Sequence, residues 1–389
     1  MNLKFGTVSS FLITAIIVTV LISFYHFGNL PLKKLEVPVL SEDKLVGCSV
    51  NRLSRVSQPS SSSCQLHVKN LTIYMDSFQW LNEKWMIGLY MAYKKASEKC
   101  SPLPGGGVCT YELDDKCTDG ILFYGAHSDL NFIKQHPKQI VISFTMEPEG
   151  GPDVLFPPNY HHDVKVSYHR TSNIPIPFIC ERDRALQLYN MGQPQIPTGR
   201  REIIGLISNC KVEWRNNYIT ELMEHIAIDQ LGECYRKKPS RFSRTRRHGN
   251  WEDKKLEFLR KSHYKYILAF ENIVESEYVT EKVFHGLLTG IIPIYYGDRS
   301  VFDYIPGNHT IIYAPDYTPR QLAEYINQIE NDEVLYSNFF KDWNLEKMLA
   351  LHKQYCYDHF MCRICRKALE VRYHQEGCIN VKLMENGDH

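Results

Sequence analysis

Three features common in other protein classes are missing from this 389-residue sequence. It has no surplus of charge of one sign, because 45 lysines and arginines balance 44 aspartates and glutamates. Nucleic-acid-binding domains usually carry a basic surplus, so charge gives no support to that class and we expect no nucleic-acid partner. No D-x-D triad is present, which argues against an enzyme that holds Mg²⁺ or Mn²⁺ on a nucleotide through such a motif. The glycines at 105–107 lack G-x-G-x-x-G spacing and are predicted to form a loop.

The cysteines indicate an oxidising compartment. There are twelve, without zinc-finger spacing across the body of the chain, so disulfides are the favoured interpretation. A C-terminal group is made up of Cys356, Cys362, Cys365 and Cys378. Because His352, His359 and His374 lie nearby, zinc binding is the alternative for this group. The spacing does not determine the disulfide pairing.

The N-terminus carries a long uncharged stretch. No charged residue lies between Lys4 and Lys33, and residues 8–27 are apolar over about the length that crosses a bilayer. We therefore predict a cytosolic tail at 1–7, a transmembrane signal anchor at 8–27 and a stem at 28–65. A cleaved signal peptide is the rival, but this stretch ends in bulky aromatic residues instead of a small-x-small site.

Two glycosylation sequons, Asn70-Leu71-Thr72 and Asn308-His309-Thr310, bear on orientation. Charges on the two sides of the predicted anchor do not decide it. Asn70 and Asn308 can be glycosylated only if the part of the chain after the anchor is luminal. The sequons therefore favour a single-pass, type II membrane protein.

Short apolar runs alternate with amphipathic stretches from about residue 66 onward. Five runs are predicted to be buried strands: 121–124, 140–144, 203–207, 266–270 and 291–296. Strands that alternate with helices predict parallel α/β layers. A Pro- and Gly-rich seam at 185–200 divides them into two Rossmann-like lobes that face a cleft. We expect an N-terminal lobe at 66–195, a C-terminal lobe at 196–350 and a Cys-rich segment at 351–389.

The run from Phe270 to Gly297 carries the strongest chemical signal. A strand that ends at Phe270 places Glu271 and Asn272 at the sheet edge where α/β folds bind ligands. Thr280 is predicted to cap a helix whose first turn holds Glu281 and Lys282. The helix N-terminus and the lysine suit a diphosphate, and the carboxylate of Glu281 suits two sugar hydroxyls. The ordinary alternative is a solvated helix start with capping charges.

This run resembles the donor-site signature of glycosyltransferase family 10, the α1,3/4-fucosyltransferases. The matching elements are F-E-N, E-Y-V-T-E-K and a G-x-x-P strand that ends in glycine. Ile273, Glu277 and Val279 depart from the usual pattern and resemble plant and invertebrate members. The resemblance implies a GT-B fold and a reaction that inverts the anomeric carbon of GDP-β-L-fucose. By motif match, Tyr278, Glu281 and Lys282 would contact the nucleotide and diphosphate, with Glu271 and Asn272 lining the donor pocket.

Upstream blocks extend the resemblance. Ser208-Asn209-Cys210, followed by Arg215, is similar to a family block whose arginine pairs with the diphosphate. The planar, permanently charged guanidinium of arginine suits this role. Glu147 follows the predicted strand 140–144 and matches the family's carboxylate base, with Glu149 as its competitor. The segment Ser167–Asn173 is similar to another family segment, without an assigned role.

The resemblance implies a Golgi enzyme that transfers fucose to a GlcNAc-containing glycan in α1,3 or α1,4 linkage. A protein O-fucosyltransferase and a catalytically silent carbohydrate-binding relative are the alternatives. Lys282 and Arg215 would neutralise the leaving diphosphate, so no metal is required, while stimulation by Mg²⁺ or Mn²⁺ is left open. The sequence does not reveal the acceptor. The basic segment 236–247 is interpreted as an exposed loop, with anion binding as its alternative.

Overall fold

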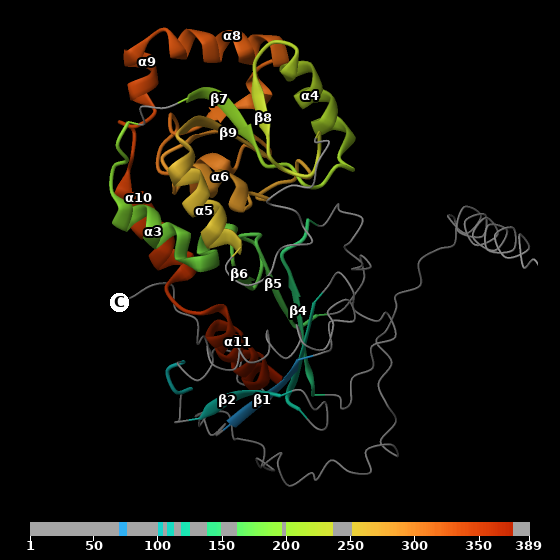
Figure 1. The fold of residues 1–389 in the computed structure, drawn as a ribbon. Coiled ribbons are helices and arrows are strands. Elements are labelled where there is room, and N and C mark those ends of the chain that lie inside the picture. Colours follow the sequence, from blue (N-terminus) through green and yellow to red (C-terminus); the bar gives the residue numbers. More distant parts are fainter. Residues whose placement is uncertain are drawn as a thin grey trace, which may run out of the picture.

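The computed structural model describes eight stretches of the chain: residues 70–75, 100–103, 107–112, 118–124, 138–148, 162–196, 200–235 and 251–375. They form two α/β lobes, one above the other in Figure 1. Six predictions fall outside the described residues: the tail, the anchor, the stem, the basic segment 236–247, Glu149 and Cys378. No helix within the described stretches is long and apolar enough to cross a membrane.

The first lobe is built on a six-stranded parallel sheet. Its strands are β1 (Asn70–Met75), β2 (Val108–Glu112), β3 (Gly120–Tyr124), β4 (Ile140–Thr145), β5 (Val164–Ser167) and β6 (Ile174–Pro175). They lie in the order β2-β1-β3-β4-β5-β6. Every residue of β4 is buried, because a central strand of a parallel sheet is covered on both faces. The strands predicted at 121–124 and 140–144 are confirmed.

The second lobe holds a five-stranded parallel sheet. Its strands are β7 (Arg200–Gly205), β8 (Ile228–Gln230), β9 (Tyr264–Phe270), β10 (Ile292–Tyr296) and β11 (Ile312–Tyr313). They lie in the order β11-β10-β9-β7-β8. The three predicted strands of this lobe are confirmed, and the chain has the α/β fold with two parallel sheets that the sequence predicts.

Helices cover both faces of the second sheet. They are α3 (Arg184–Met191), α4 (Glu213–Met223), α5 (Trp251–Ser262), α6 (Glu281–Leu287), α7 (Val301–Tyr304), α8 (Pro319–Glu330), α9 (Glu333–Asn338) and α10 (Leu345–Leu351). Apolar residues of α4 and α8 pack on one face, and those of α3, α6 and α10 belong to the core on the other. The 3-10 turn η4 (Phe178–Asp183) contributes Ile179 to that second core. The packing of the second lobe therefore includes residues that precede its first strand.

Helix α8 begins at Thr318-Pro319, where a threonine cap followed by a proline in the first turn favours a helix start. The Thr318 hydroxyl accepts a hydrogen bond from the Gln321 N–H, and the Gln321 side chain accepts one from the Thr318 N–H. This capping box satisfies two groups at the helix start.

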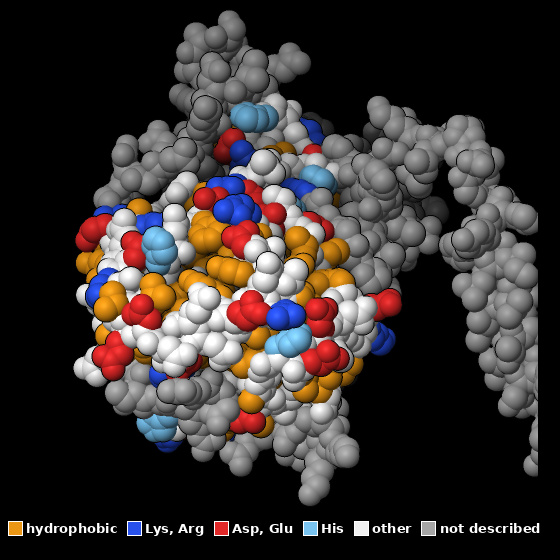
Figure 2. All heavy atoms as spheres, turned by 90° about the horizontal axis from the view of Figure 1, so that it is seen from above, with side chains coloured by type: hydrophobic (Ala, Val, Ile, Leu, Met, Phe, Trp, Pro, Cys, Tyr) orange, Lys and Arg blue, Asp and Glu red, His pale blue; other side chains and the backbone are white. Residues whose placement is uncertain are grey.

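Seen from above the second lobe, acidic and basic side chains are interspersed with hydrophobic ones (Figure 2), as on an ordinary solvated surface.

The C-terminal helix α11 (Phe360–Gln375) returns to the first lobe, where it packs on the sheet (Figure 1). Two disulfides, Cys100–Cys362 and Cys109–Cys365, fix it there. A third, Cys180–Cys356, joins η4 to the turn that follows α10, and a fourth is Cys210–Cys234. Three of the four C-terminal candidates are thus paired with cysteines far away in the sequence. No group of three metal-ligating side chains that could hold an ion occurs among the residues described.

Candidate functional site

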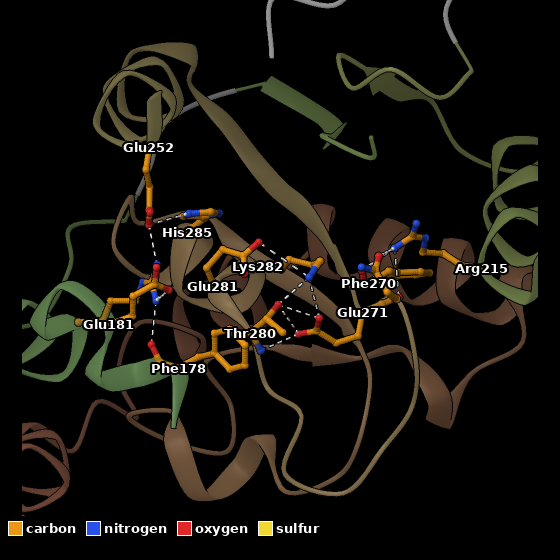
Figure 3. Close-up of polar contacts among 12 residues, drawn as sticks. Phe178, Glu181, Arg215, Glu252, Phe270, Glu271, Thr280, Glu281, Lys282 and His285 are labelled. Carbon is orange, nitrogen blue, oxygen red and sulfur yellow. Dashed lines mark hydrogen bonds and ion pairs between the residues drawn. The ribbon is translucent and has the colours of Figure 1, made fainter. Parts of the chain in front are cut away.

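A buried carboxylate ties the end of β9 to the start of α6. Glu271 follows the last residue of β9 and is fully buried. It accepts hydrogen bonds from the Thr280 N–H at 2.8 Å, from the Thr280 hydroxyl at 2.7 Å and from Lys282 Nζ at 2.8 Å (Figure 3). The Glu271 N–H in turn donates to the carbonyl of Tyr296 at the end of β10. Glu271 and Lys282, which the sequence places at one ligand-binding edge of the sheet, are therefore joined there by hydrogen bonds.

Thr280 differs in one respect from the prediction. It occupies the N-cap position of α6, but its side chain makes no capping hydrogen bond to the helix. The hydroxyl donates to Glu271 instead, because a buried carboxylate needs every donor within reach. Beyond the other end of the helix, Gly290 has a φ of 70°, the left-handed conformation that glycine adopts where helices stop.

Lys282 lies between two carboxylates. Its Nζ is 2.8 Å from Glu271 Oε2 and 3.8 Å from Glu281 Oε1, and 21% of its side chain is exposed. Burial, together with the charge of Glu281, raises the pKa of Glu271. Burial acts against the charge of Lys282, but the two carboxylates outweigh it and raise the pKa of the ammonium. Lys282 is therefore a fixed cation, partly open to solvent, at the carboxyl edge of the sheet.

Arg215 lies against the end of β9. Its side chain is buried, and Nη1 donates to Asn272 Oδ1 at 2.8 Å and to the carbonyl of Glu271 at 3.2 Å. Nη2 donates to the carbonyl of Asn209. Burial lowers the pKa of Arg215 to about 10. The guanidinium thus holds Glu271 and Asn272 in place, and its predicted contact with a diphosphate stays a prediction.

Tyr278, a candidate donor residue, packs among other aromatic side chains. Its buried ring packs edge-on against Phe178 and Tyr168, with centroids 5.7 and 5.3 Å away. Burial and the charges of Glu271 and Glu147 raise the pKa of Tyr278. Glu147 follows β4 in the first lobe, where its N–H donates to the Thr145 hydroxyl at 3.1 Å. The structure therefore brings Glu147 within electrostatic reach of the predicted donor residues of the other lobe.

A buried charge network behind α6 has no clear signal in the sequence. Glu252 Oε1 lies 2.7 Å from Arg184 Nη2 and 3.1 Å from His285 Nε2 (Figure 3). The three side chains come from α5, α3 and α6, and all are buried. Because the partners are 68 and 33 residues from Glu252 in the chain, local spacing does not reveal them. These three side chains join α6, the helix that carries Lys282, to α3 and α5.

His285 should make the protein less stable in mild acid. Burial and the charge of Lys255 lower the pKa of His285 to about 4, from an ordinary value near 6.5. The unfolded chain therefore binds a proton that the folded chain excludes between those values, and stability falls as the pH drops through that window. We expect this histidine to cost about 2 kcal/mol of unfolding free energy between pH 7 and pH 5.

Urea unfolding at both pH values measures this cost. The matched variant is His285→Gln, whose amide can still donate to Glu252 but does not titrate. It should lose less stability between the two pH values than the wild-type chain. An equal loss in both proteins would show that other groups cause the acid sensitivity.

The two sequon asparagines are exposed. Asn70 is the first residue of β1, and Asn308 lies between α7 and β11. Both are open to solvent, and their glycosylation stays a prediction.

Comparisons with known proteins find fucosyltransferases that match the part of the chain with Arg215 and the run from Phe270 to Gly297. Residues 196–382 match the family model described as glycosyltransferase family 10 (fucosyltransferase) C-term. A GDP-fucose protein O-fucosyltransferase 3 from Canis lupus familiaris is 31% identical over 191 residues, which cover 44% of this chain and 37% of the relative. Alpha-(1,3)-fucosyltransferase B from Drosophila melanogaster is 28% identical over 235 residues, or 57% of this chain and 52% of the relative. The matches thus span about a third to a half of these relatives.

A solved structure was also found to be similar. The crystal structure of an alpha1,3-fucosyltransferase aligns with a TM-score of 0.49 at 15% sequence identity. The alignment covers 82% of this chain and 97% of that one.

Proposed function

Because the chain belongs to glycosyltransferase family 10, the fucosyltransferase family, we propose that it transfers L-fucose from GDP-β-L-fucose to an acceptor hydroxyl with inversion at the anomeric carbon. The observation that carries the proposal is the edge of the second sheet, where Lys282, Glu271, Glu281 and Arg215 are held together. GDP-fucose is the donor named for the O-fucosyltransferase relative.

In this proposal Lys282 binds the diphosphate. It is a cation whose charge is secured by two carboxylates, and it is partly exposed at the strand edge where α/β folds bind nucleotides. As the bond between the fucose C1 and the β-phosphate oxygen breaks, negative charge gathers on GDP. A fixed ammonium stabilises that charge without a metal ion. We therefore expect EDTA to leave substantial activity, and complete dependence on a divalent cation would contradict this part of the proposal.

Glu147 is the proposed base. The acceptor oxygen attacks C1 from the side opposite GDP, and the hydroxyl proton passes to the Glu147 carboxylate. If the second lobe holds GDP-fucose, the base acts from the opposite side of the sugar. A base in the first lobe would face the donor residues from that side. Burial and the charges of Glu271 and Glu147 raise the pKa of Tyr278, which supports a position of Glu147 near the donor residues. Free GDP, fucosylated acceptor and one proton are the products.

The acceptor that we propose first is a GlcNAc-containing glycan, in α1,3 or α1,4 linkage. The second candidate is a folded protein domain, favoured by the 31% identity to an O-fucosyltransferase. We further propose a GT-B fold, a membrane anchor at 8–27 and a luminal, Golgi location. The four disulfides among the described residues and two exposed sequons support an oxidising lumen.

An acceptor panel tests the proposal. The full chain, produced in a secretory pathway, is incubated with labelled GDP-fucose and with core N-glycans, type 1 and type 2 chains, or folded disulfide-rich domains. Label on glycans alone would support the first candidate, and label on folded domains alone would support the second. If GDP-fucose binds but no acceptor is labelled, the chain is a silent relative.

A further inference from the structure

The segment Ser167–Asn173 forms a stiff turn between β5 and β6. The hydroxyls of Ser167 and Ser172 are buried and lie 2.5 Å apart, which closes the turn on itself. Asn173 Oδ1 accepts a hydrogen bond from the Lys165 N–H at 2.7 Å, and the Ser172 N–H donates to the carbonyl of His169. Residues 168–170 are thereby held at the edge of the first lobe. This is the family-like segment to which the sequence assigned no role.

Three consecutive side chains of this turn reach one loop of the second lobe. Tyr168 donates its hydroxyl to Glu275, and Arg170 Nε donates to Glu277. The Arg170 N–H also donates to Glu277 Oε2 at 2.8 Å, and His169 Nδ1 lies 3.4 Å from the same oxygen. The loop at 273–279 is therefore bound by both backbone and side chains of the first lobe.

Arg170 has a further anchor, since its Nη1 lies 3.0 Å from Asp303 Oδ2 in α7. One arginine thus joins the turn to two separate parts of the second lobe. Glu277 is half-buried, so its pair with Arg170 is less screened than one between two exposed side chains.

Glu277 also has an unusual backbone. Its φ is 63°, in the left-handed region that side chains other than glycine, asparagine and aspartate seldom adopt. The conformation is held by hydrogen bonds from the Glu277 N–H to Ser300 Oγ at 3.0 Å and Asp298 Oδ1 at 3.3 Å. Such conformations persist where neighbouring contacts over-determine them, and they cluster at functional sites. The residue that follows is Tyr278.

We propose that Tyr168 and Arg170 are positioning residues, which act as a clasp between the lobes and hold Tyr278 in its place for GDP-fucose. The inference rests on the proposed function. The clasp fixes Glu275 and Glu277, and the ring of Tyr168 packs directly on that of Tyr278. Through these contacts the lobe that carries the proposed base also orders the proposed donor loop. Neither clasp residue is assigned a contact with the donor.

Calorimetric titration with GDP tests the clasp in the full chain. Arg170→Ala removes the ion pairs, and Glu277→Asn removes the carboxylate while keeping a residue that tolerates the left-handed backbone. Both should weaken GDP binding about 10-fold and raise the KM for GDP-fucose, with the melting temperature nearly unchanged. Arg320→Ala is the control, because it deletes an exposed arginine–glutamate pair within α8.

The outcomes separate the clasp from the proposed function. Weaker GDP binding in Arg170→Ala and Glu277→Asn, with the control like wild type, supports the clasp. If wild type and both variants bind GDP equally, the clasp is overturned and the proposed function stands. A lower melting temperature with unchanged GDP affinity would also overturn it, since the contacts would then serve only stability. A wild-type chain that binds no GDP would overturn both.

Discussion

Replacing Glu147 with glutamine should reduce fucosyl transfer by about 10²- to 10⁴-fold, because an amide cannot take the proton of the attacking hydroxyl. Donor binding should be spared, since Glu147 belongs to the first lobe and Lys282 makes its hydrogen bonds to Glu271 and Thr280. The reaction is followed as labelled fucose transferred under saturating GDP-fucose, and GDP affinity is measured on the same preparation. The expected result is a fall in kcat at an unchanged GDP dissociation constant.

Glu149→Gln is the matched control for this experiment. It makes the same chemical change two residues away, at the only other carboxylate that the sequence offers as the base. Full activity in Glu147→Gln with loss in Glu149→Gln would move the role of base to Glu149. Loss of GDP binding in Glu147→Gln would indicate that this carboxylate supports the donor site.

The second large effect is expected at Lys282. Lys282→Ala should weaken binding of GDP-fucose on the order of 10- to 100-fold, because hydrogen bonds that involve a charged group are the strong ones. It should also destabilise the fold by about 3–5 kcal/mol, since Glu271 would remain buried without its counter-charge. Calorimetry with GDP-fucose and urea unfolding measure the two effects separately.

A double variant separates binding from stability. Lys282→Met combined with Glu271→Gln removes both charges and leaves similar volumes, so most of the lost stability should return. Donor affinity should stay low, because no ammonium remains for the diphosphate. If affinity returned together with stability, Lys282 would have only a structural role. Unchanged affinity in Lys282→Ala would exclude it from the donor site.

Much of the fold could be predicted from the sequence because its signals are local. Buried parallel strands are short apolar runs, and those at 140–144 and 266–270 lie within β4 and β9. The start of α8 is encoded locally, by Thr318, Pro319 and Gln321. The return of α11 to the first sheet was not predicted, since it depends on contacts and disulfides between residues more than 250 positions apart. No spacing rule reveals such a pairing.

In the candidate site, too, local features could be predicted from the sequence and contacts between distant residues could not. Glu271, Asn272, Glu281 and Lys282 lie within one short run, so their convergence could be predicted from a strand and a helix start. The partners of Arg215 could not, because burial turns its guanidinium towards the carbonyls of β9 and its neighbours. Glu252 and His285 meet only through the packing of α5 on α6. The turn at 168–170 attracted notice as a family-like segment, yet its role became visible only with the loop that it binds.

Titration of the full chain with GDP-fucose tests the central claim most directly. The account predicts saturable binding at one site, competition by GDP and no binding of UDP-N-acetylglucosamine. It also predicts that Lys282→Ala loses most of this affinity. A chain that binds neither GDP nor GDP-fucose, while folded by its melting transition, would contradict the assignment of the β9–α6 edge as the donor site.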